Sequence, residues 1–118
     1  MIPKQITVFG ASGFIGRHVV RRLAAAGVRV IAAARDAERA SFLKTMGDVG
    51  QVVPVPCNVM DGGRVKALLE GSGAVVNLVG ILFATTAQRF ADIHGRAPGI
   101  IAAAAARAGI DRLVHISA

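Results

Sequence analysis

The chain has 118 residues, of which 53% are hydrophobic, so it is expected to form one domain with its own core and not a disordered polymer. Its formal net charge of +7 would suit a nucleic-acid partner, but the basic residues are scattered over every expected helix. The chain also has no Trp or Tyr for bases to stack on, so none is expected. One cysteine and no apolar run of about 20 residues exclude a disulfide framework, a secreted protein and a membrane span, which favours a cytoplasmic protein.

The first expected element is an apolar strand at residues 4–9, rich in β-branched side chains. Because it is apolar on both faces, it is expected at the centre of a sheet. It runs directly into three glycines, Gly10, Gly13 and Gly16. A backbone without Cβ atoms can approach an anion closely, and a helix start offers unpaired N–H groups and the positive end of the helix dipole. This stretch therefore predicts a pyrophosphate-binding turn.

A helix is predicted after the turn, at residues 14–26. Its apolar face is expected to consist of Ile15, Val19 and Leu23, which recur every four positions. A second strand at residues 28–34 completes a unit of about 30 residues, the length that a right-handed parallel crossover requires. The confirming context around the glycines makes dinucleotide binding the favoured interpretation.

The rest of the chain continues the alternation of helices and strands. The expected elements are a helix capped by Asp36 and ending near 46, a turn at 47–50, a strand at 51–56, a helix at 64–70 capped by Asp61, a strand at 74–79, a loop at 80–88, a helix at 89–108 and a strand at 112–117. Pro54 and Pro56 indicate that the third strand lies at a sheet edge or is short, and Pro98 must cost the long helix a hydrogen bond or kink it. The prediction is an α/β fold: one doubly wound parallel sheet in the order 3-2-1-4-5, with ligands at the carboxyl ends of its strands.

Arg35 follows the second strand, where a residue that reads the adenosine ribose belongs. An acid there accepts hydrogen bonds from the ribose hydroxyls, whereas an arginine attracts a 2′-phosphate, so Arg35 favours NADP(H) over NAD(H). Two alternatives stay open: Asp36 takes the hydroxyls, or Arg35 is an ordinary surface residue. Arg17 either reinforces the phosphate site or is a solvated helix residue.

Several further side chains have a binding and a structural interpretation. Ser12 either bonds phosphate or caps the helix, and Asn58 either bonds the adenine or forms a turn. Cys57 is expected to be a small buried hydrophobe, and Asn77, inside an apolar strand, needs a hydrogen-bond partner. No catalytic residue is assigned, and the histidines give no metal signature. The residues expected to contact the dinucleotide are Gly10, Ala11, Ser12, Gly13, Phe14, Ile15, Gly16, Arg35, Asn58, Val59, Leu78, Val79, Gly80 and Ser117.

Residues 10–20, Gly-Ala-Ser-Gly-Phe-Ile-Gly-Arg-His-Val-Val, resemble the glycine motif of extended and atypical short-chain dehydrogenase/reductases of the NAD-dependent epimerase/dehydratase type. The motifs at 46–51, 75–81 and 114–118 resemble a narrower group, the nucleotide-binding accessory subunit of respiratory complex I and its bacterial relatives. The resemblance covers essentially the whole chain. It implies a Rossmann fold and bound NADPH. It also implies either respiratory-complex subunits or a second copy of the chain as partners. Assembly with respiratory-complex subunits would place the protein at the inner membrane.

Catalytic relatives carry a Tyr-x-x-x-Lys pair after strand five, and this chain contains no tyrosine. His94 stands where extended members have an asparagine, which argues against sugar-nucleotide epimerase chemistry. We expect residues 1–118 to be an NAD(P)-binding domain from the N-terminal part of a longer protein. Two functions follow: an NADP(H)-holding module without turnover, or part of an active oxidoreductase or epimerase/dehydratase. Redox sensing also fits such a domain.

Overall fold

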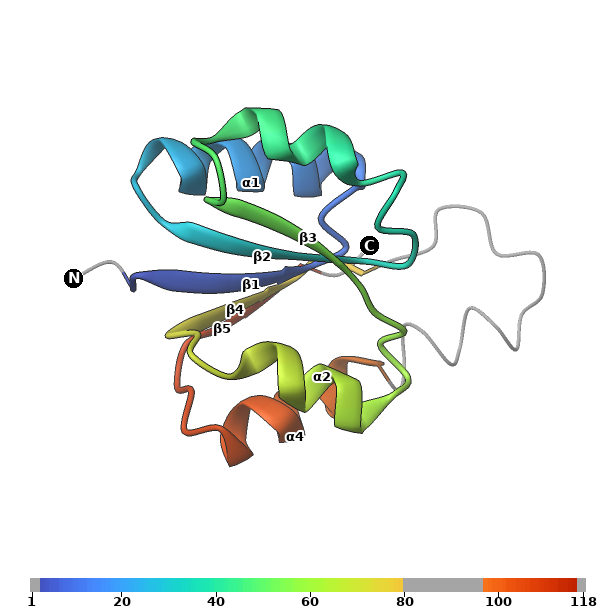
Figure 1. The fold of residues 1–118 in the computed structure, drawn as a ribbon. Coiled ribbons are helices and arrows are strands. Elements are labelled where there is room, and N and C mark those ends of the chain that lie inside the picture. Colours follow the sequence, from blue (N-terminus) through green and yellow to red (C-terminus); the bar gives the residue numbers. More distant parts are fainter. Residues whose placement is uncertain (1–2, 80–96, 117–118) are drawn as a thin grey trace.

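The computed structural model describes residues 3–79 and 97–116, which form a five-stranded parallel sheet with helices on both faces (Figure 1). The strand order is β3-β2-β1-β4-β5, which confirms the predicted topology and the central place of the first strand. The elements in chain order are β1 (Gln5–Phe9), α1 (Phe14–Ala25), β2 (Arg29–Ala34), the 3-10 helix η1 (Ser41–Met46), β3 (Val52–Pro56), α2 (Gly62–Leu69), β4 (Ala74–Asn77), α4 (Ala97–Arg107) and β5 (Leu113–His115).

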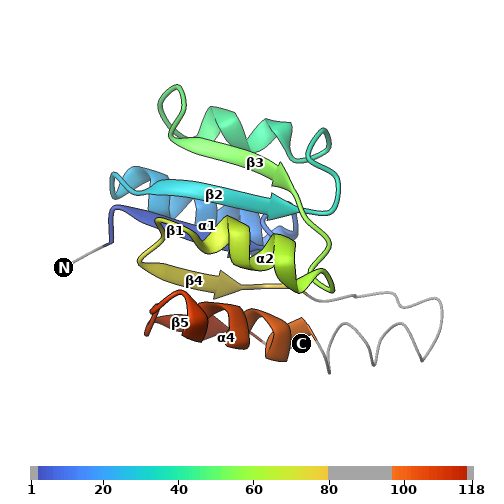
Figure 2. The same cartoon turned by 60° about the horizontal axis from the view of Figure 1, so that its bottom comes forward.

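The sheet separates two hydrophobic cores. Helices α1 and η1 cover one face, and α2 and α4 cover the other (Figures 1 and 2). Side chains of β1 alternate between them: Ile6 and Val8 pack in the α1 core, whereas Phe9 packs in the α2 core. Thr7 faces α2, where its hydroxyl donates to Leu68 O at 2.9 Å. Burial on both faces explains why the sequence of β1 is apolar throughout.

The buried face of α1 differs from the prediction. Gly16, Val20 and Ala24 are the buried residues, Val19 and Leu23 are half-buried, and Ile15 is 50% exposed. A Cβ on Gly16 would contact the backbone oxygens of the glycine turn, so the helix presses its glycine side against the strand–turn junction. That contact centres the buried face on the glycine side of the helix. Val19 and Leu23 still pack against the α1 core, and of the predicted apolar face only Ile15 is left exposed.

Strand β3 lies at a sheet edge, as its prolines predicted. The β2–β3 ladder includes a hydrogen bond from Val30 N–H to Gln51 O at 2.9 Å. In a parallel ladder every second residue points its backbone polar groups at the neighbour, so Pro54 and Pro56 point theirs away from β2. Both prolines therefore stand where no ladder bond is lost. Val52 is the one β3 residue whose N–H faces the open edge. Because the open edge offers so few N–H donors, it is poorly suited to pairing with another strand.

The motif at residues 46–51 is a structural clamp. Gln51 Nε2 donates to Ala24 O (2.8 Å) and Val28 O (3.0 Å), and its Oε1 accepts from Asp48 N–H (2.9 Å). One amide thus ties the turn before β3 to the end of α1 and the start of β2. A Cβ on Gly47 would lie 2.6 Å from Gln51 Oε1, so the glycine leaves room for the clamp.

The segment after β2 also departs from the expected form. Asp36 caps a turn at 37–40 and not a helix, since the helical segment that follows is the 3-10 helix η1, which starts at Ser41. The expected effect of Pro98 on the long helix depends on residues before Ala97, which lie outside the described residues. Asp61 caps α2 as predicted, accepting from Arg64 N–H at 3.1 Å. The expected loop at 80–88 and the first part of the expected long helix, residues 89–96, lie outside the described residues.

Candidate functional site

The carboxyl ends of the four strands β3, β2, β1 and β4 lie side by side at one end of the sheet. Backbone hydrogen bonds join neighbouring ends, from Leu78 N–H to Phe9 O (2.9 Å), from Gly10 N–H to Ala33 O (3.1 Å) and from Cys57 N–H to Ala34 O (2.9 Å). The residues that follow the strands therefore lie in a row along this end of the sheet. The row brings together four of the predicted contact residues, Asn58, Arg35, Gly10 and Val79.

The three glycines of the turn have different physical roles. Gly10 has a φ of 77°, and a Cβ there would lie 2.8 Å from Leu78 C and 2.9 Å from Val79 N. A Cβ on Gly16 would contact Gly10 O and lie 2.7 Å from Ala11 O. On Gly13, by contrast, a Cβ would meet, among the described residues, only Gly10 O, at an ordinary 3.5 Å. Gly10 and Gly16 therefore serve the packing of the protein itself, whereas Gly13 is exposed and its packing does not require a glycine.

The start of α1 presents unpaired hydrogen-bond donors. Gly13 is the N-cap and no side chain caps the helix, so Ser12 does not have the capping role. Within residues 3–79 and 97–116, the N–H groups of Phe14, Ile15 and Gly16 have no acceptor. The first turn holds no acidic side chain, and the positive end of the helix dipole lies at the same place. Donors in this arrangement suit an anionic acceptor.

The Arg17 side chain donates hydrogen bonds to carbonyl oxygens of the glycine turn. Its Nη2 donates to Ser12 O at 3.2 Å and its Nε to Gly13 O at 3.4 Å, while its guanidinium lies 5.0 Å from the ring centroid of Phe42. The side chain thus links the turn to η1. Sequence reasoning missed Phe42, because residues so far apart along the chain carry no local signal of stacking.

Arg35 and Asp36 differ in how free their side chains are. Asp36 Oδ1 accepts from the backbone N–H groups of Glu38 (3.0 Å) and Arg39 (3.2 Å), which occupies that oxygen inside its own turn. Arg35 is exposed just past β2, and its side chain makes no hydrogen bond within the described part of the chain. Arg35 is therefore the freer of the two to meet a ligand.

The segment after β3 is held by local bonds. Asn58 Oδ1 accepts from Met60 N–H at 3.0 Å, so Asn58 forms a turn, the structural one of its two interpretations. Val59 is half-buried against the α2 core. Cys57 is 7% exposed, and burial raises the pKa of its thiol, with Arg64 opposing and Asp61 adding to that rise. The thiol is a buried hydrophobe, as predicted, and not an activated nucleophile.

The remaining predicted residues divide into three groups. Ala11 is fully buried, and Leu78 and Val79 are half-buried beside Gly10. Phe14 and Ile15 are exposed at the helix start. The Phe14 and His18 rings pack edge to face, with their centroids 5.1 Å apart. Outside the described residues lie Gly80, Ser117 and His94.

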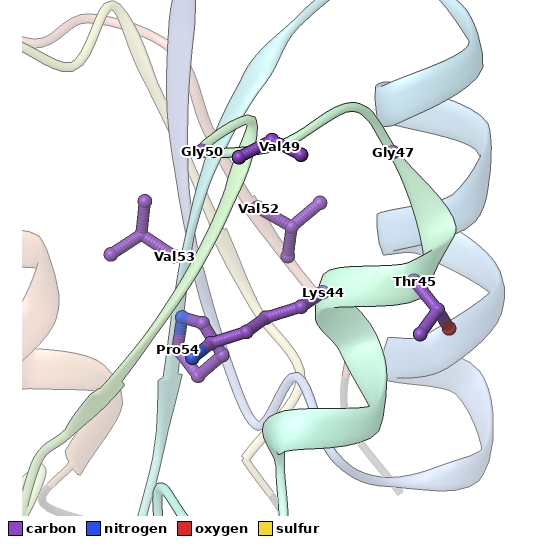
Figure 3. A pocket seen from close by; sticks show the side chains of 8 residues that line it. All are labelled: Lys44, Thr45, Gly47, Val49, Gly50, Val52, Val53 and Pro54. Carbon is purple, nitrogen blue, oxygen red and sulfur yellow. The ribbon is translucent and has the colours of Figure 1, made fainter.

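A cleft of about 630 Å³ lies elsewhere, between η1 and the edge strand β3 (Figure 3). Its lining consists of Lys44, Thr45, Gly47, Val49, Gly50, Val52, Val53 and Pro54. It contains none of the predicted contact residues and no acidic side chain. Across residues 3–79 and 97–116, no cluster of three His, Cys, Asp or Glu side chains suits a metal ion, and no helix is long and apolar enough to cross a membrane.

Two mitochondrial proteins are similar over nearly all of the chain. Subunit 9 of the NADH dehydrogenase (ubiquinone) 1 alpha subcomplex from Rattus norvegicus is 37% identical over 112 residues, which cover 94% of this chain and 30% of that protein. The NADH-ubiquinone oxidoreductase 40 kDa subunit from Neurospora crassa is 36% identical over 111 residues, with the same coverage. The chain therefore spans just under a third of the length of these relatives.

The fold has solved counterparts. The structure of UDP-glucose-4-epimerase from Stenotrophomonas maltophila, with bound NAD, superposes with a TM-score of 0.82 at 21% identity, covering 95% of this chain and 36% of that one. A sequence model of the NAD dependent epimerase/dehydratase family matches residues 6–118. These findings confirm the resemblance stated from the glycine motif, and the chain belongs to the NAD dependent epimerase/dehydratase family.

Proposed function

We propose that this chain is a dinucleotide-binding module that holds NADP(H) in preference to NAD(H). The observation that carries the proposal is the unpaired row of N–H groups from Phe14 to Gly16, at the switch between β1 and β4. A pyrophosphate would accept from these donors and meet the helix dipole. Gly13 leaves the approach open, and the Ser12 hydroxyl, which has no partner within the described residues, would add a further donor.

The preference for NADP(H) rests on Arg35. Its free guanidinium stands at the end of β2, where it would pair with a 2′-phosphate, and Oδ1 of Asp36 is already engaged in a turn. The epimerase that shares the fold was solved with NAD, so the shared fold does not itself favour NADP(H). The support for NADP(H) comes from Arg35.

The module is proposed to be the N-terminal region of a longer protein that assembles with respiratory-complex subunits, or with a second copy of itself. Relatives about three times as long, named as subunits of a respiratory NADH dehydrogenase, support this. A cytoplasmic location stays a prediction, since both relatives are mitochondrial. Family membership supports a second candidate, part of an active NAD(P)-dependent oxidoreductase or epimerase/dehydratase, and a Tyr-x-x-x-Lys pair further along the protein would favour it.

Titration with NADPH and NADH tests the proposed function. NADPH is expected to bind about tenfold more tightly than NADH and to raise the thermal midpoint more, because a charge-assisted bond to the 2′-phosphate stabilises its complex. Arg35→Asp is expected to remove or reverse this preference. Calorimetric titration gives both dissociation constants.

Arg29→Asp is the matched control. Arg29 begins the same strand at the opposite edge of the sheet, so the change in net charge is identical but lies about 20 Å from the site. It should leave the NADPH to NADH ratio unchanged. Binding of neither dinucleotide would overturn the proposed function, whereas an intact preference in Arg35→Asp would overturn only the ribose assignment.

A further inference from the structure

Asn77 ends β4 as a buried amide with both of its polar ends paired. It is 1% exposed, its Oδ1 accepts from Val79 N–H at 3.0 Å, and its Nδ2 lies 2.8 Å from His115 Nδ1. His115 is its register partner on β5 and is exposed. The predicted need of Asn77 for a partner is therefore met by two groups, one of them from a different motif. A buried amide that lost either bond would carry the cost of an unpaired polar group.

The bonds indicate which nitrogen of His115 accepts. A backbone N–H only donates, so the Asn77 atom that faces Val79 is the oxygen, and the atom that faces His115 is the NH₂ group. That group also only donates, so His115 Nδ1 accepts. A proton on Nδ1 would set two donors against each other, so this bond requires the tautomer whose proton is on Nε2.

The pair reaches the glycine turn through one peptide unit. The N–H that Asn77 holds belongs to the Leu78–Val79 peptide, and a Cβ on Gly10 would lie 2.8 to 2.9 Å from the carbon and nitrogen of that peptide. Leu78 N–H also donates to Phe9 O at 2.9 Å. Asn77 thus helps to fix the position of the Leu78–Val79 peptide relative to the glycine turn.

We propose that Asn77 and His115 are a positioning pair for the dinucleotide site. His115 Nδ1 orients the Asn77 amide, and the amide fixes the Leu78–Val79 peptide beside Gly10. This inference rests on the proposed dinucleotide binding. Neither residue needs to touch the ligand, since both act through the backbone of Val79.

Two variants of His115 separate positioning from packing. His115→Asn keeps an acceptor at the same number of bonds from Cα, and it should bind NADPH within about twofold of the wild type. His115→Leu has no acceptor and should bind about tenfold more weakly, with Val79 amide exchange about tenfold faster in the free protein. Because position 115 is exposed, both variants are expected to fold, which circular dichroism checks.

Nitrogen-15 spectra of the wild-type imidazole give a separate readout. They should show His115 protonated on Nε2 and bare on Nδ1. A proton on Nδ1 in the neutral ring, or unchanged NADPH affinity together with unchanged Val79 exchange in His115→Leu, would overturn the pair. Failure of the wild type to bind any dinucleotide would instead overturn the proposed function, and faster Val79 exchange in His115→Leu would still support the positioning of this peptide.

Discussion

Gly16→Ala is expected to lower the free energy of unfolding by about 2–4 kcal/mol, although alanine normally stabilises a helix interior by up to about 1 kcal/mol relative to glycine. The reason is the space around the new Cβ, which would contact Gly10 O and lie 2.7 Å from Ala11 O. Both atoms are backbone and cannot move aside as a flexible side chain would. Urea unfolding followed by circular dichroism measures the loss.

Gly99→Ala is the control for that change. Gly99 also lies in a helix, and a Cβ there would meet no atom of the described residues within 4 Å. The intrinsic preference for alanine should then be visible as unchanged or slightly raised stability. If Gly16→Ala were as stable as the wild type, α1 would not be pressed against the turn through Gly16.

Gly13→Ala is expected to have the opposite character, with folding nearly intact and dinucleotide binding weakened by about tenfold to a hundredfold. The free protein has room for this Cβ, whose nearest contact is 3.5 Å, so the stability loss should be about 1 kcal/mol or less, mostly from a poorer N-cap. The methyl group would instead stand where a pyrophosphate approaches the Phe14 and Ile15 N–H groups. Calorimetric titration with NADPH measures the effect.

Gly63→Ala matches this variant, because Gly63 also stands at a helix start and its Cβ would meet an ordinary contact at 3.6 Å. It should keep the wild-type dissociation constant. Equal affinities for Gly13→Ala and wild type would show that no ligand passes over Gly13.

The strand order and the glycine turn were predictable because their signals are local or topological. The βαβ spacing, the prolines of β3 and the Asp61 cap each depend on a few neighbouring residues, and all three are confirmed. The apolar face predicted for α1 is correct only in part, since Val19 and Leu23 pack against the core and Ile15 is exposed. Periodicity in Ile15, Val19 and Leu23 records which residues are apolar, but not that a glycine without a side chain makes the closest contact.

The contacts that sequence reasoning could not foresee join distant parts of the chain. The Arg17–Phe42 stack, the Gln51 clamp and the Asn77–His115 pair each depend on how the sheet brings separate segments together. For Asn77 the sequence did hold a partial signal, an amide inside an apolar strand, which predicted a partner without identifying it. The strand register then supplied His115.

An NMR titration of the nitrogen-15-labelled protein with NADPH tests most directly whether the glycine turn holds a dinucleotide. The largest amide shifts are predicted at Phe14, Ile15 and Gly16, with a further shift at Val79 beside Gly10, because an accepted pyrophosphate changes the field at those N–H groups. Saturable binding whose shifts instead gather around Lys44 and Val53, in the cleft between η1 and β3, would contradict this account, as would no shift at residues 14–16.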